Sequence, residues 1–318
     1  MKKVWYVVVG LFLFVFGFFT SSLLTSKTNS PVSIARSKQI GLTSPLLDCE
    51  LNTYLQEPQL HQAKTDIEAY LQENKNSYRE TAVYFRDLNN GPWFGINERA
   101  RYAPVSLLKV PVMIAYLKIA ESNPLVLQDK LPYGGEHVLD ENIPVSQQLT
   151  QGVSYSLNEL IHRMIALSDN VAFEILVNHL NNEDLKTVHQ ELGLIYPDKL
   201  TPDDYITVKS YAGLFRILYN STYLNREMSE KALSYLLDSD FDRGIRAGLP
   251  KNIRSALKFG IKDGLEEKED SQIHDCGIVY VPEKPYLLCI MTKGQNREKL
   301  VEIIANISKT VYKNIALP

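Results

Sequence analysis

The sequence lacks three features that mark common functional classes: an excess of basic residues, a dense set of cysteines, and histidines paired at a metal-binding spacing. Its 318 residues include 34 Lys and Arg against 37 Asp and Glu, for a formal net charge of −3. Nucleic-acid binding calls for a basic domain with a clustered patch, so we expect no nucleic-acid partner. The six histidines are scattered and form no HxH or HExxH pair, the pattern that supplies two metal ligands from one face. We therefore expect neither a metal nor another cofactor.

Cysteine is equally scarce. Cys49, Cys276 and Cys289 make an odd count, too few for a disulfide framework. Cys276 and Cys289 lie in apolar runs, where a free cysteine behaves as a small buried hydrophobe. Chain separation alone cannot show disulfide geometry. Two buried thiols are therefore the favoured interpretation, and a bridge is the alternative.

An uncharged apolar run occupies residues 4–24, directly after Lys2 and Lys3. About 20 such residues span a bilayer as a helix, and lysines before the run keep the N-terminus in the cytoplasm. No clear A-x-A cleavage pattern follows, and a cleaved signal peptide usually has a shorter apolar core. Residues 1–24 are predicted to be an uncleaved signal anchor in the cell membrane, with the body of the protein on the extracytoplasmic side. Cleavage and secretion are the alternative.

Downstream of this run, composition divides the chain into a linker and one large domain. Residues 25–59 are rich in Ser, Thr, Leu, Pro and Gln without sustained periodicity, which is typical of a tether. Residues 60–318 carry helix and strand patterns over a length that suits one large domain. We expect a monomer.

The order of periodic segments predicts the fold class. Apolar periodicity distinguishes helix from strand, and Asn89-Asn90-Gly91 between two strand patterns indicates a β-hairpin. Helices are expected over residues 60–74, 106–120, 157–167 and 298–314, with more between 171 and 239, and strands over 81–88, 92–98, 253–260, 276–282 and 285–294. The class is α/β (α+β): one antiparallel sheet built from both ends of the domain and flanked by helices, plus an all-helical lobe. A cleft between the two is the default place for a site.

Ser106 and Lys109 open the first long helical segment after the hairpin. Positions i and i+3 share a helix face, so the hydroxyl and the amine can be neighbours. Serine needs a base beside it to act as a nucleophile, and burial can lower the pKa of a lysine enough to supply one. An isolated serine at a helix start is more often a cap, so this pair alone indicates little.

Two further polar groups follow. Ser168-Asp169-Asn170 lies between two helical segments, where Ser168 can pass a proton and Asn170 can donate an amide hydrogen bond, with Asp169 as structural support. Such a triplet is otherwise an ordinary helix junction. Lys258 and Gly260 lie in a strand pattern, where the lysine can bind a carboxylate and the glycine permits close approach of a substrate backbone.

The order S-x-x-K, S-D-N, K-x-G is similar to the signature of class A beta-lactamases and penicillin-binding proteins. The resemblance runs from about residue 60 to the C-terminus. It implies a beta-lactamase/transpeptidase-like fold, acylation of Ser106 by a beta-lactam or peptidoglycan peptide, and assistance from Lys109 and Ser168. By the same resemblance, Asn170 and Lys258 bind the substrate, Gly260 borders it, and the backbone N–H groups of Ser106 and Ile261 form the oxyanion hole.

Two departures from the family's pattern stand out. Phe259 occupies the middle of the third motif, where the family has Thr or Ser; Lys262-Asp263-Gly264 is an alternative register. The E-x-x-L-N glutamate that serves deacylation in class A enzymes is absent from the sequence. Asp203 and Asp204 lie at a suitable distance along the chain, but Thr201-Pro202-Asp203-Asp204 also fits a helix N-terminus, which is the interpretation we favour. Glu191 is a weaker candidate.

Three functions are therefore open. The leading hypothesis is a beta-lactamase that opens the beta-lactam ring and deacylates slowly. The second is a penicillin-binding D,D-peptidase acting on peptidoglycan stem peptides. The third is a sensory module that is acylated or occupied by ligand with little turnover.

Overall fold

The computed structural model describes residues 42–43, 57–89, 91–134, 140, 143–264 and 269–316. The chain divides into two compact units, Met1–Lys38 and Gln39–Pro318, and all described residues belong to the second. The predicted signal anchor, residues 4–24, lies outside the described residues. Within the described residues, no helix is long and apolar enough to cross a membrane.

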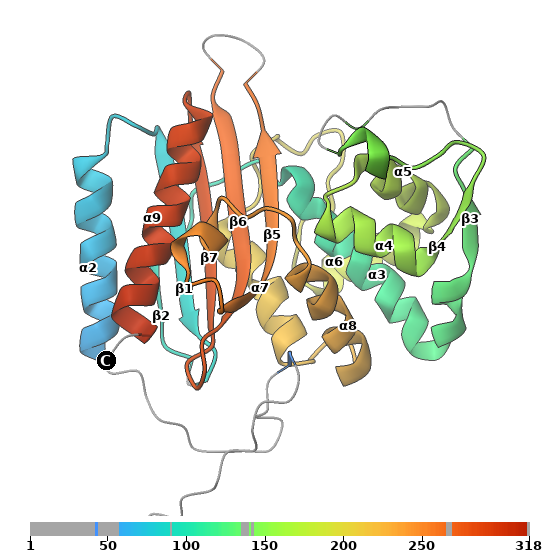
Figure 1. The fold of residues 1–318 in the computed structure, drawn as a ribbon, viewed down its shortest axis with the longest axis horizontal. Coiled ribbons are helices and arrows are strands. Elements are labelled where there is room, and N and C mark those ends of the chain that lie inside the picture. The colour runs from blue at the N-terminus through green and yellow to red at the C-terminus, as the bar shows by residue number, and fades with distance from the viewer. Residues whose placement is uncertain are drawn as a thin grey trace, which may run out of the picture. The chain divides into compact units, whose positions relative to one another are not determined.

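A five-stranded antiparallel sheet forms the centre of the fold, in the order β2-β1-β7-β6-β5 (Figure 1). Its strands are β1 (Glu80–Asp87), β2 (Trp93–Ile96), β5 (Arg254–Lys262), β6 (Ser271–Tyr280) and β7 (Tyr286–Gly294). The first hairpin and the last three strands therefore join one sheet, as the sequence predicted. Because β6 and β7 are covered on both faces, their residues are almost all buried.

Helices cover both faces of the sheet (Figure 1). The first and last, α2 (Glu57–Glu73) and α9 (Arg297–Ala316), pack on one face. Side chains alternate across a strand, so Val83 and Leu257 join the apolar cluster under α2 and α9, whereas Ala82 and Ala256 join the cluster on the helical side.

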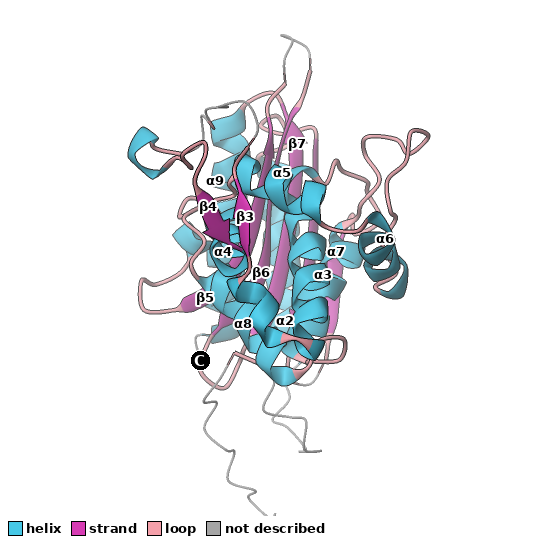
Figure 2. Cartoon of the chain, turned by 90° about the vertical axis from the view of Figure 1, so that its right-hand side faces the viewer, coloured by secondary structure: helices cyan, strands magenta, loops and turns pink. Residues whose placement is uncertain are grey.

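The helical lobe packs around α3, seen in front of the sheet in Figure 2. Its helices are α3 (Lys109–Ser122), α4 (Leu157–Ala166), α5 (Asn170–His179), α6 (Asn182–Glu191), α7 (Val208–Tyr219) and α8 (Arg226–Leu237). Residues 109–117 of α3 are all buried, the pattern of a helix enclosed on every side. Ser156 caps α4 by accepting a hydrogen bond from the Glu159 backbone N–H, as its sequence predicted. A small sheet of β3 (Lys130–Pro132) and β4 (Ser154–Ser156) was not predicted.

Part of the predicted linker packs against this body. The backbone N–H of Thr43 donates a 2.9 Å hydrogen bond to Glu230 on α8. The Tyr280 hydroxyl donates to the Leu42 carbonyl at 3.1 Å, and Leu42 is buried. The packed structure therefore includes residues that precede position 60.

The interpretation of Cys276 and Cys289 as free thiols is wrong: they form a disulfide. The antiparallel register of β6 and β7 places these two residues directly opposite each other, with their Cα atoms 4.0 Å apart. Directly opposite residues in an antiparallel pair come closest together. Strand register, which the sequence alone did not give, is what brings the sulfur atoms together.

Candidate active site

Ser106 lies in a short 3₁₀ turn, η2 (Val105–Leu108), and α3 begins only at Lys109. The sequence had placed Ser106 in the α-helix itself. Val105 has a φ of 49°, which is rare for a β-branched residue and costs about 1–3 kcal/mol. Such strain persists only where the surroundings over-determine the backbone. The contacts around this turn supply that constraint.

Buried side chains hold the turn from two sides. From β6, Gln272 accepts a hydrogen bond from the Ala103 N–H at 3.0 Å, and His274 bonds the Ala103 carbonyl through Nε2 at 3.0 Å. From α7, the Tyr211 hydroxyl donates to the Leu107 carbonyl at 3.0 Å. Burial lowers the pKa of His274 to about 4, so the ring is neutral at pH 7 and its Nε2–H donates to Ala103.

Lys109 is the centre of the polar contacts. Its side chain is buried, and its Nζ lies 3.2 Å from the Ser106 Oγ, 2.6 Å from the Ser168 carbonyl oxygen and 2.7 Å from the Asn170 Oδ1. The three residues that the sequence indicated from separate segments therefore converge on one amine. This geometry lets the amine take a proton from Ser106 while two acceptors fix its position.

The charge state of Lys109 is set mainly by its surroundings. Burial lowers its pKa from 10.5 to about 8, and the carboxylates of Asp140 and Asp169 oppose that shift. At pH 7 about a tenth of the amine is thus unprotonated, and this fraction rises to about half at pH 8. A general base is most effective when its pKa lies near the working pH, and Lys109 meets that condition.

Ser168 lies between two lysines. Its Oγ accepts hydrogen bonds from Lys109 Nζ at 3.1 Å and from Lys258 Nζ at 3.0 Å. Its φ of 57° places it in the left-handed region, so its carbonyl and its hydroxyl can both face Lys109. Burial, followed by the nearby charge of Lys109, lowers the pKa of Lys258 well below its usual range. The hydroxyl is placed to pass a proton between the two lysine amines.

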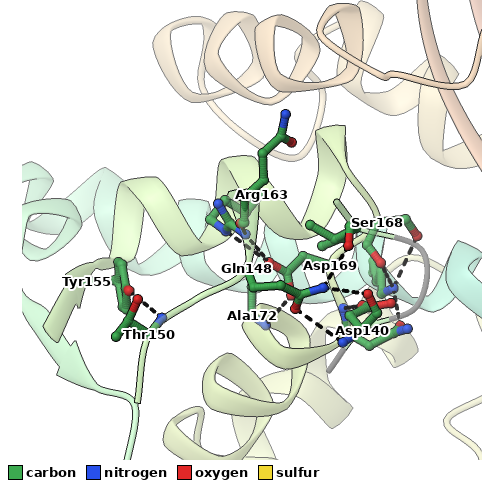
Figure 3. Close-up of polar contacts among 12 residues, drawn as sticks. Asp140, Gln148, Thr150, Tyr155, Arg163, Ser168, Asp169 and Ala172 are labelled. Atoms are coloured by element: carbon green, nitrogen blue, oxygen red, sulfur yellow. Dashed lines mark hydrogen bonds and ion pairs between the residues drawn. The ribbon is translucent and has the colours of Figure 1, made fainter. Parts of the chain in front are cut away.

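Buried carboxylates fix the start of α5, beside Ser168 (Figure 3). Asp169 caps the helix by accepting from the Ala172 N–H at 2.9 Å, and it pairs with Arg163 at 2.8 Å. The Asp140 Oδ2 accepts from the Asn170 N–H at 2.7 Å. Acids at a helix N-terminus are stabilised there, and here they hold Asn170 in reach of Lys109.

The third motif faces the same centre from β5. A Cβ added to Gly260 would lie 3.3 Å from Leu107 Cγ and 3.5 Å from the Pro104 carbonyl oxygen. The backbone of β5 at Gly260 therefore lies directly against the η2 turn that carries Ser106. Lys258, not Lys262, reaches Ser168. Lys262 instead pairs with Asp203 and Glu269. The structure thus places Lys258, and not Lys262, beside Ser168; the substrate-binding role of Lys258 and the oxyanion hole at Ser106 and Ile261 stay predictions.

Comparison with known proteins identifies the family to which this site belongs. A model of the beta-lactamase enzyme family matches residues 62–315. The chain belongs to the beta-lactamase enzyme family. It is, at the level of the family, a serine hydrolase, as the three motifs indicated.

Solved structures share the fold. The TLA-1 extended spectrum beta-lactamase has a TM-score of 0.71 at 18% identity, covering 81% of this chain and 99% of that chain. A class A beta-lactamase from Bacteroides cellulosilyticus DSM 14838 has 0.71 at 18%, covering 82% and 99%. A point mutant of PBP-A, solved as an acyl-enzyme complex with penicillin G, has 0.67 at 20%, covering 80% and 96%. A comparison with curated protein sequences finds no match. The beta-lactamase/transpeptidase-like fold is confirmed.

The first departure of this beta-lactamase-family chain is an aromatic wall beside Lys258. The Phe259 ring stacks on Phe241 with centroids 4.6 Å apart, and Lys258 Nζ lies 4.2 Å from the Phe259 centroid. Lys258 Nζ also donates to the Phe259 carbonyl at 2.9 Å. Where the family has a hydroxyl, this chain therefore has an aromatic ring. The adjacent Lys258 amine already donates hydrogen bonds to Ser168 and to the Phe259 carbonyl.

The second departure concerns the carboxylates, and the predicted cap is wrong. Helix α7 begins at Val208 and is capped by Thr207. Asp204 instead accepts hydrogen bonds from Gln272, at 2.8 Å, and from Lys293, and the Asp203 side chain is 88% exposed. The predicted helix start at Pro202 therefore lies ahead of the helix, which follows Thr207.

The third candidate carboxylate, Glu191, accepts a hydrogen bond from the Tyr223 hydroxyl at 2.5 Å. It lies at the end of α6, on an exposed position as the sequence indicated. In the described part of the chain, no carboxylate oxygen forms a hydrogen bond or ion pair with Ser106, Lys109 or Ser168. The described residues thus place no general base of the glutamate type in hydrogen-bonding contact with Ser106, Lys109 or Ser168.

Proposed function

We propose that this protein is a beta-lactam-hydrolysing enzyme of the class A type in which Ser106 forms the acyl-enzyme. The observation that carries the proposal is the buried Lys109 amine, 3.2 Å from the Ser106 Oγ, with its pKa lowered to about 8. Lys109 removes the Ser106 proton as Oγ attacks the lactam carbonyl. The carbon–nitrogen bond then breaks, and Ser168 delivers a proton to the leaving nitrogen.

The remaining residues bind and polarise the substrate in this proposal. The negative charge of the arriving substrate carboxylate favours the protonated form of Lys258, which then binds it. Asn170 donates its amide N–H groups to the substrate side chain while Oδ1 accepts from Lys109. Backbone N–H groups of Ser106 and Ile261 stabilise the developing oxyanion, a contribution that is typically large in acyl transfer. Because Phe259 supplies no hydroxyl, the carboxylate relies on Lys258, and weak ground-state binding of penicillins is expected.

We expect acylation to be faster than deacylation. A positioned general base typically raises the rate of such a step about 10²–10⁴-fold. Neither Asp203 nor Asp204 is placed to raise the deacylation rate in this way, because Asp203 pairs with Lys262 and Asp204 bonds Gln272 and Lys293. Stopped-flow hydrolysis of a chromogenic cephalosporin should show a burst of about one equivalent followed by slow turnover. Asp203→Asn and Asp204→Asn should leave the slow phase within about threefold of the wild type, whereas the Asp204 variant should unfold more easily because it loses its partners on β6 and β7.

A wild type without a burst, together with collapse of turnover in either aspartate variant, would show that this aspartate is the deacylating base. Slow turnover also makes a second function worth testing. A point mutant of PBP-A, a structural relative, was solved with penicillin G attached. A D,D-peptidase would release D-alanine from a muropeptide, and a sensory module would release neither D-alanine nor hydrolysed cephalosporin.

We also propose that the protein is exported and held in the membrane by residues 4–24. The Cys276–Cys289 disulfide supports export because such bonds are rare in the reducing cytosol. Cells should be quenched with acid and fractionated. The free cysteine thiols of the protein should then be alkylated under denaturing conditions without reductant. The protein should appear in the membrane fraction with one label, on Cys49, and should take three labels after reduction. Three labels without reductant, or recovery in the cytosol, would refute export.

A further inference from the structure

A second concave site lies at the opposite edge of the sheet from Ser106. Its volume is 290 Å³, and it lies between one face of α7 and a row of residues on β7, β1 and β2. Antiparallel register places Leu287, Arg86 and Trp93 side by side across these three strands. Since β5, which borders Ser106, is the far edge strand, this pocket is separate from the catalytic cleft.

Helix α7 forms the other wall through one stripe of its surface. Lys209, Ala212, Gly213 and Arg216 line the pocket, at spacings that share a helix face. The middle of the stripe is small, and a Cβ added to Gly213 would meet no atom within 4 Å. Glycine inside a helix is unfavourable relative to alanine, and the structure shows no close packing that requires it. Its effect is to keep space open between two cations.

Three cationic residues line this space: Arg86, which is half-buried, and Lys209 and Arg216, which are exposed. Within the described residues, none of them forms a hydrogen bond or ion pair with a carboxylate. Cations that face one another across a pocket repel, so an anion between them would relieve the repulsion.

The pocket also has an apolar wall. Trp93 is 43% exposed and stacks on Tyr84 with ring centroids 5.6 Å apart. Lys209 Nζ lies 4.3 Å from the Trp93 ring centroid, so the lysine and the indole meet at the same place. An aromatic surface next to several cations suits a ligand that has both an anionic group and an organic body.

We propose that this pocket binds an organic phosphate monoester. The planar guanidinium group of arginine can form two parallel hydrogen bonds with phosphate oxygens. A doubly negative phosphate also neutralises three cations better than a singly negative carboxylate does. The phosphate lies between Arg86, Arg216 and Lys209, and the organic part contacts Trp93 and fills the space above Gly213. The site is independent of the acylation chemistry at Ser106.

The test uses the full chain in detergent with phenyl phosphate as probe. The sequence contains two tryptophans, so Trp5→Phe leaves Trp93 as the sole reporter of binding by fluorescence, and calorimetry on the unmodified chain gives an independent Kd. Phenyl phosphate should bind more tightly than inorganic phosphate. Arg86→Gln and Arg216→Gln should each weaken binding about tenfold or more, whereas Lys313→Gln, on α9, should not change it.

Gly213 provides the matched pair. Gly213→Leu fills the pocket without changing its charge and should abolish binding, while Gly213→Ala adds one methyl group and should retain it. Both variants should still be labelled by penicillin at Ser106, which shows that they are folded. Absence of binding to the unmodified chain, affinity equal to that of inorganic phosphate, or binding that survives Gly213→Leu would each overturn the proposal.

Discussion

Ser106→Ala is expected to abolish covalent labelling by benzylpenicillin, a loss of at least about a thousandfold, because the only nucleophile in the proposed reaction is removed. The fold should be unaffected. Among the described residues, the Ser106 hydroxyl forms one hydrogen bond, with Lys109, and forms no capping bond to η2 or α3. Intact-protein mass spectrometry gives the labelling, and thermal unfolding gives the stability.

Ser234→Ala is the matched control. Ser234 lies on α8 with an exposed hydroxyl that donates to the Lys231 carbonyl, so the same atom is removed far from the site. This variant should be labelled at the wild-type rate. Undiminished labelling of the Ser106 variant would end the proposed mechanism.

Acylation should rise with pH and level off above about 8. Lys109 must be unprotonated to accept the Ser106 proton, and its pKa lies at about 8, so the rate should increase about tenfold per pH unit below that value. Asp140→Asn should move the midpoint to lower pH, since the carboxylate of Asp140 raises the pKa of Lys109. Stopped-flow acylation from pH 5 to 10 gives both profiles.

Lys109→Met should lower the acylation rate by about 10²–10⁴-fold and remove this pH dependence. Methionine fills a similar buried volume without an amine. Lys118→Met is the control on the same helix, where the amine lies near the surface and pairs with Glu121. A pH profile that keeps its midpoint near 8 in the Lys109 variant would assign the titration to another group.

Much of the fold could be predicted because local patterns agree with tertiary structure. The hairpin around Asn89 and the helix after Ser156 followed from turn and capping chemistry, which acts over a few residues. The polar cluster around Lys109 could also be predicted, because Ser106 and Lys109 are three residues apart and Ser168 and Lys258 belong to motifs with known order. Their convergence on one amine needed the structure.

The remaining features depend on contacts between distant segments. Gln272 and His274 hold the backbone of Ala103, but in the sequence they are ordinary polar residues in a strand. The Cys276–Cys289 bond depends on strand register. Asp204 was misread because an acid after proline fits a helix start equally well, and only its partners Gln272 and Lys293 show otherwise.

The central claim is that Ser106 forms an acyl-enzyme and that this acyl-enzyme is hydrolysed more slowly than it forms. Time-resolved mass spectrometry with benzylpenicillin tests this claim most directly. We expect rapid appearance of one adduct with the full mass of penicillin, mapped by peptide digestion to Ser106, and decay of this adduct much more slowly than it forms. Formation should be faster at pH 8 than at pH 6. No adduct at any time with no hydrolysis of the drug, or an adduct on another residue, would contradict it.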